Sequence, residues 1–186
     1  MARISMPRVT FQHHRRDIRC HRGNAMMTEA NGEAYDPYRL QRFVDAQASC
    51  FAQVRSELLA GQKQSHWMWF VFPQIKGLGS SPMAQRFAIS GPAEANAYLL
   101  HPVLGDRLRD CTALVNAVDG RSVHDIFGYP DDLKFHSSVT LFAWVVAHGS
   151  PFQMLGNQVF ADALKKYFNG VPDQATLDRL PRGVES

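Results

Sequence analysis

Apolar residues recur at helical spacing through most of the chain after residue 35. Residues three, four or seven positions apart lie on one face of an α-helix, and the clearest such stripe is Leu40, Phe43, Val44, Phe51, Val54 and Leu58. Asp36 followed by Pro37 is typical of a helix start, and Gly61 of a helix end. The pattern therefore predicts one long helix over residues 37–61.

Similar signals predict helices along the rest of the chain. Proline directly after Ser81 and after Gly91 indicates two helix starts. Apolar stripes then predict further helices over residues 103–118, 122–127, 131–148, 151–170 and 173–180. We expect Asp131 or Asp132 to cap the helix that follows Pro130, and Asp173 to cap the last one.

The apolar run over residues 65–72 is ambiguous, because a run this short fits either a buried strand or a buried helix. A strand needs a partner, and the other segment rich in β-formers, residues 139–146, has a helical period. We therefore predict a helix with Ser65 as its cap and Pro73 at its end. The fold class predicted is all-α, a single compact domain of about seven or eight helices over residues 34–182.

Composition agrees with one globular domain and narrows its class. The chain has 186 residues, 45% of them hydrophobic, which is ordinary for a globular protein. Its longest apolar run, residues 141–147, is far shorter than the roughly 18–20 residues that cross a bilayer. Cys20, Cys50 and Cys111 form no C-x-x-C pair, which disfavours a disulfide framework or zinc ribbon. We expect a reduced, cytoplasmic protein with no membrane partner, metal or cofactor.

The positive charge is concentrated in the first residues. Residues 1–27 hold six arginines and one acid, whereas residues 28–186 carry a net charge of −2. Nucleic acid is therefore an unlikely partner for the folded body. We interpret residues 1–33 as a basic disordered tail, and three origins are open for it: an arm that contacts nucleic acid, an organellar presequence, or non-native sequence ahead of a start at Met26 or Met27. The third is favoured, because nothing in the tail indicates a fold.

Six segments of the body resemble a known family. They are residues 40–47, 65–74, 77–80, 101–105, 127–134 and 137–142. The most specific of them reads Trp-Met-Trp at residues 67–69 and Phe-Pro-Gln at 72–74. Over residues 35–180 the chain resembles the bacterial family named domain of unknown function 1810 (DUF1810). The resemblance implies an all-α fold and no established activity.

Some members of that family carry the label calpastatin. Calpain inhibitors of that name are disordered repeat chains, whereas this body is expected to be compact and aromatic. The label therefore supports no function here.

The candidate chemistry lies in polar residues set among aromatic ones. The sequence has no G-x-S-x-G elbow, H-E-x-x-H zinc site or phosphate-binding P-loop. His66 is the candidate general base. The candidate ligand-binding residues are Gln74, Lys76, Gly77, Gly79, Ser80, Asp132, Lys134, Ser137 and Ser138. Glycines let backbone N–H groups approach an anion, and lysines add positive charge.

Each of these features also has a structural interpretation. A histidine such as His66 often only braces a helix, a glycine loop is often only a turn, and Trp67 and Trp69 fit a packed core. Two function classes stay open. The first is a protein that binds a small anionic or nucleotide-like ligand in a pocket, with or without catalysis. The second is a non-catalytic structural or protein-interaction module. Convergence of the candidate side chains on one concave site favours the first, and scattering favours the second.

Overall fold

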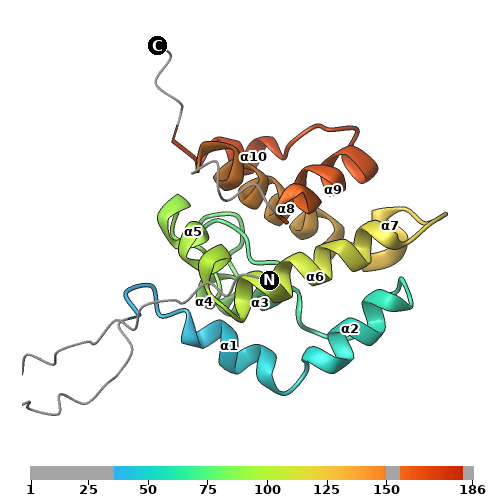
Figure 1. Cartoon of the computed structure of the whole chain (residues 1–186), viewed down its shortest axis with the longest axis horizontal. Coiled ribbons are helices and arrows are strands. Elements are labelled where there is room, and N and C mark those ends of the chain that lie inside the picture. Colours follow the sequence, from blue (N-terminus) through green and yellow to red (C-terminus); the bar gives the residue numbers. More distant parts are fainter. Residues whose placement is uncertain (1–35, 150–155, 182–186) are drawn as a thin grey trace, which may run out of the picture. The chain divides into compact units, whose positions relative to one another are not determined.

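The computed structural model describes residues 36–149 and 156–181. This part of the chain contains ten helices and no strand, which confirms the all-α prediction but exceeds the seven or eight helices expected. The helices are α1 (Gln41–Ala48), α2 (Phe51–Leu59), α3 (Met68–Val71), α4 (Pro82–Arg86), α5 (Pro92–Leu100), α6 (Leu104–Ala117), α7 (Val123–Phe127), α8 (Asp131–His148), α9 (Gln158–Phe168) and α10 (Gln174–Leu177) (Figure 1). The predicted tail, residues 1–33, lies outside the described residues.

One of the extra helices arises because the predicted helix over residues 37–61 is divided. Residues 36–40 form a turn rather than the first turn of the helix. Ser49 and Cys50 are also not helical, and they separate α1 from α2. Gln47, two residues before the break, is buried, and its amide donates to the carbonyl of Phe70 at 2.7 Å and to the hydroxyl of Tyr98 at 3.1 Å. The polar residue in the apolar stripe is therefore directed into the core.

The helix predicted over residues 65–72 is shorter than expected, and Ser65 does not cap it. Only Met68–Val71 is helical, and the hydroxyl of Ser65 donates instead to the carboxylate of Glu57 at 2.6 Å. The indole N–H of Trp67 donates to the same carboxylate at 2.7 Å. The buried carboxylate of Glu57 thus accepts hydrogen bonds from residues 64, 65 and 67, all of which lie before the helix.

The predicted helix starts at Ser81 and Asp173 are confirmed. The side chain of Ser81 accepts from the N–H of Ala84, and that of Asp173 accepts from the N–H of Thr176. Neither Asp131 nor Asp132 caps α8, which follows Pro130 with no side-chain cap. The carboxylate of Asp131 is instead paired with two lysines, so it does not bind the N–H groups at the start of α8.

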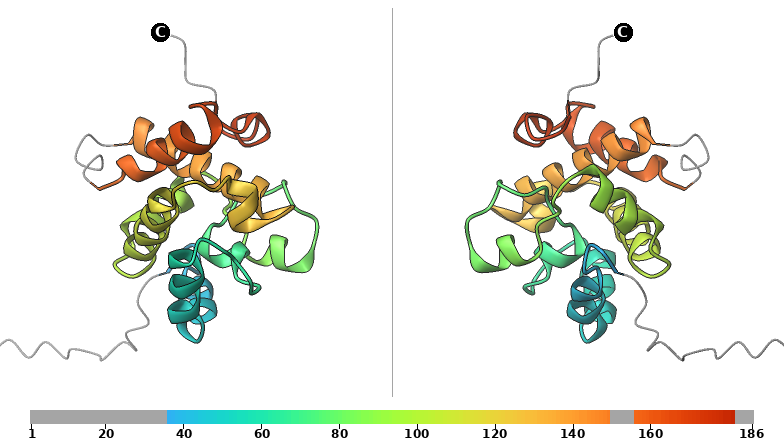
Figure 2. Two further views of the ribbon diagram at one scale, coloured as in Figure 1. Left: turned by 90° about the vertical axis from the view of Figure 1, so that its right-hand side faces the viewer. Right: turned by 90° about the vertical axis from the view of Figure 1, so that its left-hand side faces the viewer.

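The core is built around α8. This helix packs against α3, α5, α7, α9 and α10, while α6 packs against α2, α5 and α9. Figures 1 and 2 show α1 and α2 at one end of the domain and α9 and α10 at the other. Phe135 and Phe142 of α8 are fully buried among aromatic rings. Burial of these rings supplies the main driving force for packing the helices.

Two sequence-distant segments meet outside the helices. A single parallel β-bridge joins Ile75 to Ile89, with the N–H of Lys76 donating to the carbonyl of Ile89 at 2.8 Å. The N–H of Ile89 in turn donates to the carbonyl of Gln74 at 2.9 Å. This bridge places Lys76 beside the segment that follows α4.

The described residues contain neither a membrane-spanning helix nor a metal-binding cluster. Within residues 36–149 and 156–181, no helix is both long and apolar enough to span a bilayer. Over the same ranges, no group of three or more histidine, cysteine, aspartate or glutamate residues is placed to hold a metal ion.

A candidate anion-binding pocket beside α1

A pocket lined by basic side chains lies between the start of α1 and the segment around α4. Its volume is about 420 Å³, and it is lined by Tyr38, Arg39, Arg42, Lys76, Gln85, Arg86, Ala88 and Ser90. Four of these eight residues carry a positive charge and none carries a negative one. We refer to it as the basic pocket.

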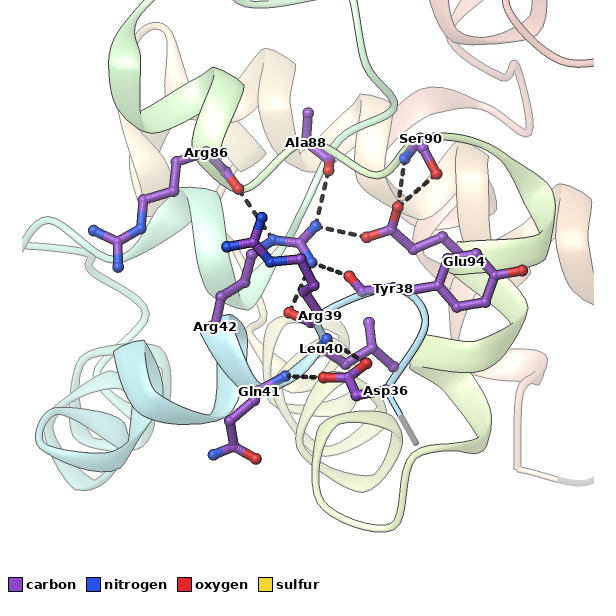
Figure 3. Close-up of polar contacts among 10 residues, drawn as sticks. All are labelled: Asp36, Tyr38, Arg39, Leu40, Gln41, Arg42, Arg86, Ala88, Ser90 and Glu94. Atoms are coloured by element: carbon purple, nitrogen blue, oxygen red, sulfur yellow. Dashed lines mark hydrogen bonds and ion pairs between the residues drawn. The ribbon is translucent and has the colours of Figure 1, made fainter. Parts of the chain in front are cut away.

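Arg42 holds the two walls of the basic pocket together. Its guanidinium donates to the carbonyls of Tyr38 and Arg39 on one wall and to those of Arg86 and Ala88 on the other (Figure 3). A fifth hydrogen bond, 2.6 Å long, reaches the carboxylate of Glu94. Because an arginine has five N–H donors, Arg42 has none left for a ligand. Its role is to position the pocket.

Glu94 stabilises the position of Arg42. Its carboxylate is buried and also accepts from the N–H and the hydroxyl of Ser90, at 2.8 and 2.6 Å. The charge of Arg42 is thereby balanced by Glu94 within one hydrogen-bonded unit. The positive charge of the pocket consequently comes from the other cations.

Asp36 shapes the turn that leads into α1. Its two carboxylate oxygens accept from the N–H groups of Leu40 and Gln41, at 2.8 and 2.9 Å. Partial burial raises the pKa of Asp36, but these N–H groups, together with the charges of Arg42 and His101, outweigh it and hold the pKa below its ordinary value. Asp36 therefore stabilises the turn before α1, but the helix begins only at Gln41 and its N-cap residue, Leu40, has no side-chain cap.

The turn forces Arg39 into a left-handed backbone conformation, with φ of 54°. An L-residue with a Cβ costs roughly 1–2 kcal/mol there. Asn169, the other described non-glycine residue with positive φ, is the C-cap of α9, where asparagine is common. Arg39 has no such local explanation. Strain at a residue that lines a pocket is typical of functional sites.

Three cations of the basic pocket are free to bind a ligand. Arg39, Lys76 and Arg86 are exposed, and within the described segments their side chains form no ion pair or hydrogen bond with another residue. The guanidinium of Arg86 lies 5.2 Å from the ring centre of Phe87. In Figure 3 it extends away from the guanidinium of Arg42. Unpaired cations around one concavity attract anions.

Replacing Arg42 by lysine should destabilise the domain by roughly 1–3 kcal/mol, the range expected when the hydrogen bonds of one charged donor are lost. Lysine keeps the charge beside Glu94 but does not reproduce the planar set of donors that holds four carbonyls. Urea denaturation measures the effect. Arg55→Lys is the matched control, because Arg55 pairs with Asp110 at the surface; equal losses in the two variants would contradict the anchoring role.

Of the ligand-binding residues predicted from sequence, Lys76 lines the basic pocket. The adjacent loop residues have local structural roles instead. Gly77 has φ of 97° and its carbonyl accepts from Arg179 at 3.0 Å. A Cβ on Gly79 would lie 2.5 Å from that of Ala84, and the carbonyl of Ser80 accepts from the side chain of Gln85. Gln74 contributes its backbone carbonyl to the bridge.

Lys134 belongs to a separate ion cluster. Its ammonium and that of Lys63 each lie 2.6 Å from one oxygen of Asp131, and the Lys134 ammonium lies 4.8 Å from the ring centre of Trp69. Burial raises the pKa of Asp131, but the two lysines outweigh it and lower the pKa. Trp69 is only half-buried, whereas Trp67 is a fully buried core residue.

The other predicted site residues are dispersed. Asp132 lies 2.9 Å from Nδ1 of His124, and the hydroxyl of Ser137 lies 2.7 Å from that of Thr176. Ser138 is fully buried, and its hydroxyl has no partner within the described residues. His66 is exposed, and no described residue forms a hydrogen bond with its ring. The structure therefore supplies no group that would orient His66 as a general base.

The site residues predicted from the sequence do not converge on one concave site. This counts against a pocket formed by those residues together. The pocket that exists combines Lys76 with arginines that sequence reasoning did not select, namely Arg39, Arg42 and Arg86. Arg42 lies within the segment 40–47 that carries the family resemblance, and this was the one indication in the sequence that Arg42 has a special role. Its pairing with Glu94, 52 residues further along the chain, requires the fold.

The described residues form a compact all-α domain with a basic, concave surface. The family described as "Protein of unknown function (DUF1810)" matches residues 37–180, and the chain belongs to this family. It is similar to the crystal structure of the conserved hypothetical protein Rv1873 from Mycobacterium tuberculosis, at 53% identity and a TM-score of 0.72. The match covers 78% of this chain and 98% of that one. No curated protein matches the chain.

Proposed function

We propose that this protein binds a small anionic ligand in the basic pocket. The observation that carries the proposal is the set of three unpaired cations, Arg39, Lys76 and Arg86, around one concavity of about 420 Å³. Sites for small molecules occupy about 300–1,000 Å³. Arg42 and Glu94 pre-form the walls, so little order has to be gained when a ligand binds.

The backbone strain at Arg39 supports the same site. Glycine adopts positive φ without strain, yet the turn carries an arginine, whose side chain lines the pocket. The backbone strain at Arg39 has a functional explanation if the guanidinium of Arg39 contributes to ligand binding. No bond-breaking step is assigned to the pocket, and the role of His66 as a general base stays a separate hypothesis.

Arg39→Gly and Lys76→Ala should each weaken the binding of inorganic pyrophosphate about tenfold, because loss of one close charge is worth on the order of 1.4 kcal/mol. Arg39→Gly should leave the free energy of unfolding within about 1 kcal/mol of the parent, since glycine relieves the strain but increases the entropy of the unfolded chain. Isothermal titration calorimetry and urea denaturation measure the two quantities.

The matched control is Lys165→Ala on α9, at the opposite end of the domain from α1 (Figure 2). It removes one exposed positive charge without touching the pocket and should leave the affinity unchanged. Equal affinities in the parent and in both pocket variants, or equal losses in all three variants, would contradict the proposal.

The second candidate function is a protein-interaction module. Tyr129 precedes α8 and Leu133 lies in its first turn, and they are 77% and 57% exposed. Large exposed apolar side chains are typical of contact surfaces when they form a patch. Binding of pyrophosphate to the parent with no loss in the pocket variants would leave this candidate as the better account.

A further inference from the structure

We infer that the ligand of the basic pocket is an organic phosphate whose phosphomonoester group is bound as a dianion by Arg39, Lys76 and Arg86. This inference rests on the proposed function and names the substrate class of the same site. It is carried by the number of free cations, by the size of the pocket and by the apolar part of its wall.

The charge of the free cations matches a dianion better than a monoanion. Arg42 is balanced by Glu94 and has no donor to offer, so the lining contributes three uncompensated positive charges. A carboxylate or a sulfate ester carries one negative charge. A phosphomonoester carries about −1.5 to −2 at pH 7 and presents three strong acceptor oxygens. A phosphomonoester therefore offers one acceptor oxygen for each of the three cations.

The size of the pocket indicates that the phosphate is attached to an organic group. A volume of about 420 Å³ far exceeds the space that a bare phosphate fills, since one water occupies only about 30 Å³ in the liquid. The rest of the lining includes Tyr38 and Ala88, which have apolar side-chain atoms. An aromatic or aliphatic group of the ligand would lie against these surfaces.

Several titratable groups surround the pocket and have to be considered in a pH test. From the turn before α1 and from α1 they are Asp36, Tyr38, Arg39 and Arg42; from the segment 76–94, Lys76, Arg86 and Glu94; and from the end of α5, His101. Protons taken up by any of them as the pH falls add positive charge, which strengthens the binding of every anion. A permanently monoanionic probe therefore controls for them.

The test compares phenyl phosphate with phenyl sulfate, which has the same shape but a single charge. Calorimetric titrations of the full chain at pH 7.5 should show phenyl phosphate binding about tenfold more tightly, the effect of one additional unit charge. At pH 5.0 phenyl phosphate is mainly a monoanion, because its second pKa is about 6, and the two affinities should approach each other. Inorganic phosphate, which lacks the ring, should bind more weakly than phenyl phosphate at pH 7.5.

The double variant Arg39→Gly/Lys76→Ala, with Lys165→Ala as its control, assigns the binding to the pocket. It should remove the preference for phenyl phosphate, whereas Lys165→Ala should keep it. Equal affinities for phenyl phosphate, phenyl sulfate and benzoate at pH 7.5 would overturn the dianion inference while leaving anion binding intact. Inorganic phosphate binding as tightly as phenyl phosphate would overturn the organic part. Failure of every probe to bind, or binding unchanged in the double variant, would overturn both the inference and the proposed function.

Discussion

Replacing Glu57 by alanine should destabilise the domain by roughly 3–5 kcal/mol, the range expected when several buried donors lose one charged acceptor. The carboxylate accepts five hydrogen bonds, two from Ser65 and one each from Gln53, Gln64 and Trp67, at 2.6–3.1 Å. No cation shares this site among the described residues. Urea denaturation measures the loss, with the exposed Asp162→Ala on α9 as the control. Equal effects of the two substitutions would contradict the assigned role.

The same residue gives the domain a defined acid sensitivity. Burial raises the pKa of Glu57, but the hydrogen bonds from Gln64, Ser65 and Trp67 outweigh it and bring the pKa to about 2. The folded state therefore favours the charged form, and this contribution is complete above the ordinary value near 4.5 and is lost as the pH falls toward 2. The contribution amounts to roughly 3 kcal/mol, since each pKa unit corresponds to about 1.4 kcal/mol.

Glu57→Gln separates the charge from the packing. Glutamine has nearly the same shape but no ionisable proton, so the unfolding free energy of this variant should fall less steeply between pH 5 and pH 2 than that of the parent. Parallel curves for parent and variant over this range would show that Glu57 is not the source of the acid sensitivity.

Phe135→Ala should cost roughly 3–5 kcal/mol, as is usual for removing a buried aromatic ring. Phe135, in the second turn of α8, is fully buried, with the ring centres of Phe72 and Phe127 at 5.0 and 4.9 Å. Leu133→Ala is the control on the same helix, because Leu133 is 57% exposed, and it should change the stability by no more than about 0.5 kcal/mol. Similar losses for the two variants, measured by thermal unfolding, would contradict the placement of the core.

The sequence predicted the fold class where local signals and tertiary packing agree. Ser81 and Asp173 start their helices as expected, because each side chain accepts from an N–H group in the first turn of its own helix. The predictions for Ser65 and Asp131 were wrong for the opposite reason. Ser65 is bonded to the buried Glu57, and Asp131 is paired with Lys63 and Lys134. The pairing of Asp131 with Lys63, 68 residues earlier in the chain, leaves no periodic trace in the sequence.

The candidate site was accessible to sequence reasoning only at Lys76. The basic pocket depends on the Ile75–Ile89 bridge and on the contact of Arg42 with Glu94, which join segments well separated in the chain. The backbone strain at Arg39 could not be predicted from the sequence either, since arginine has no preference for positive φ. The candidate residues chosen near aromatic segments proved to lie in several different places, because those segments form the core rather than one surface.

The central claim is that anions bind at the basic pocket, and mapping amide chemical shifts of the ¹⁵N-labelled full chain during a pyrophosphate titration tests it most directly. The account predicts saturable shifts concentrated at residues 38–42, at Lys76 and at residues 85–90, which surround the pocket. These shifts should be lost in Arg39→Gly/Lys76→Ala and kept in Lys165→Ala. Shifts confined to the Lys63–Asp131–Lys134 cluster or to the N-terminal arginines, with residues 38–42 and 85–90 unchanged, would contradict it.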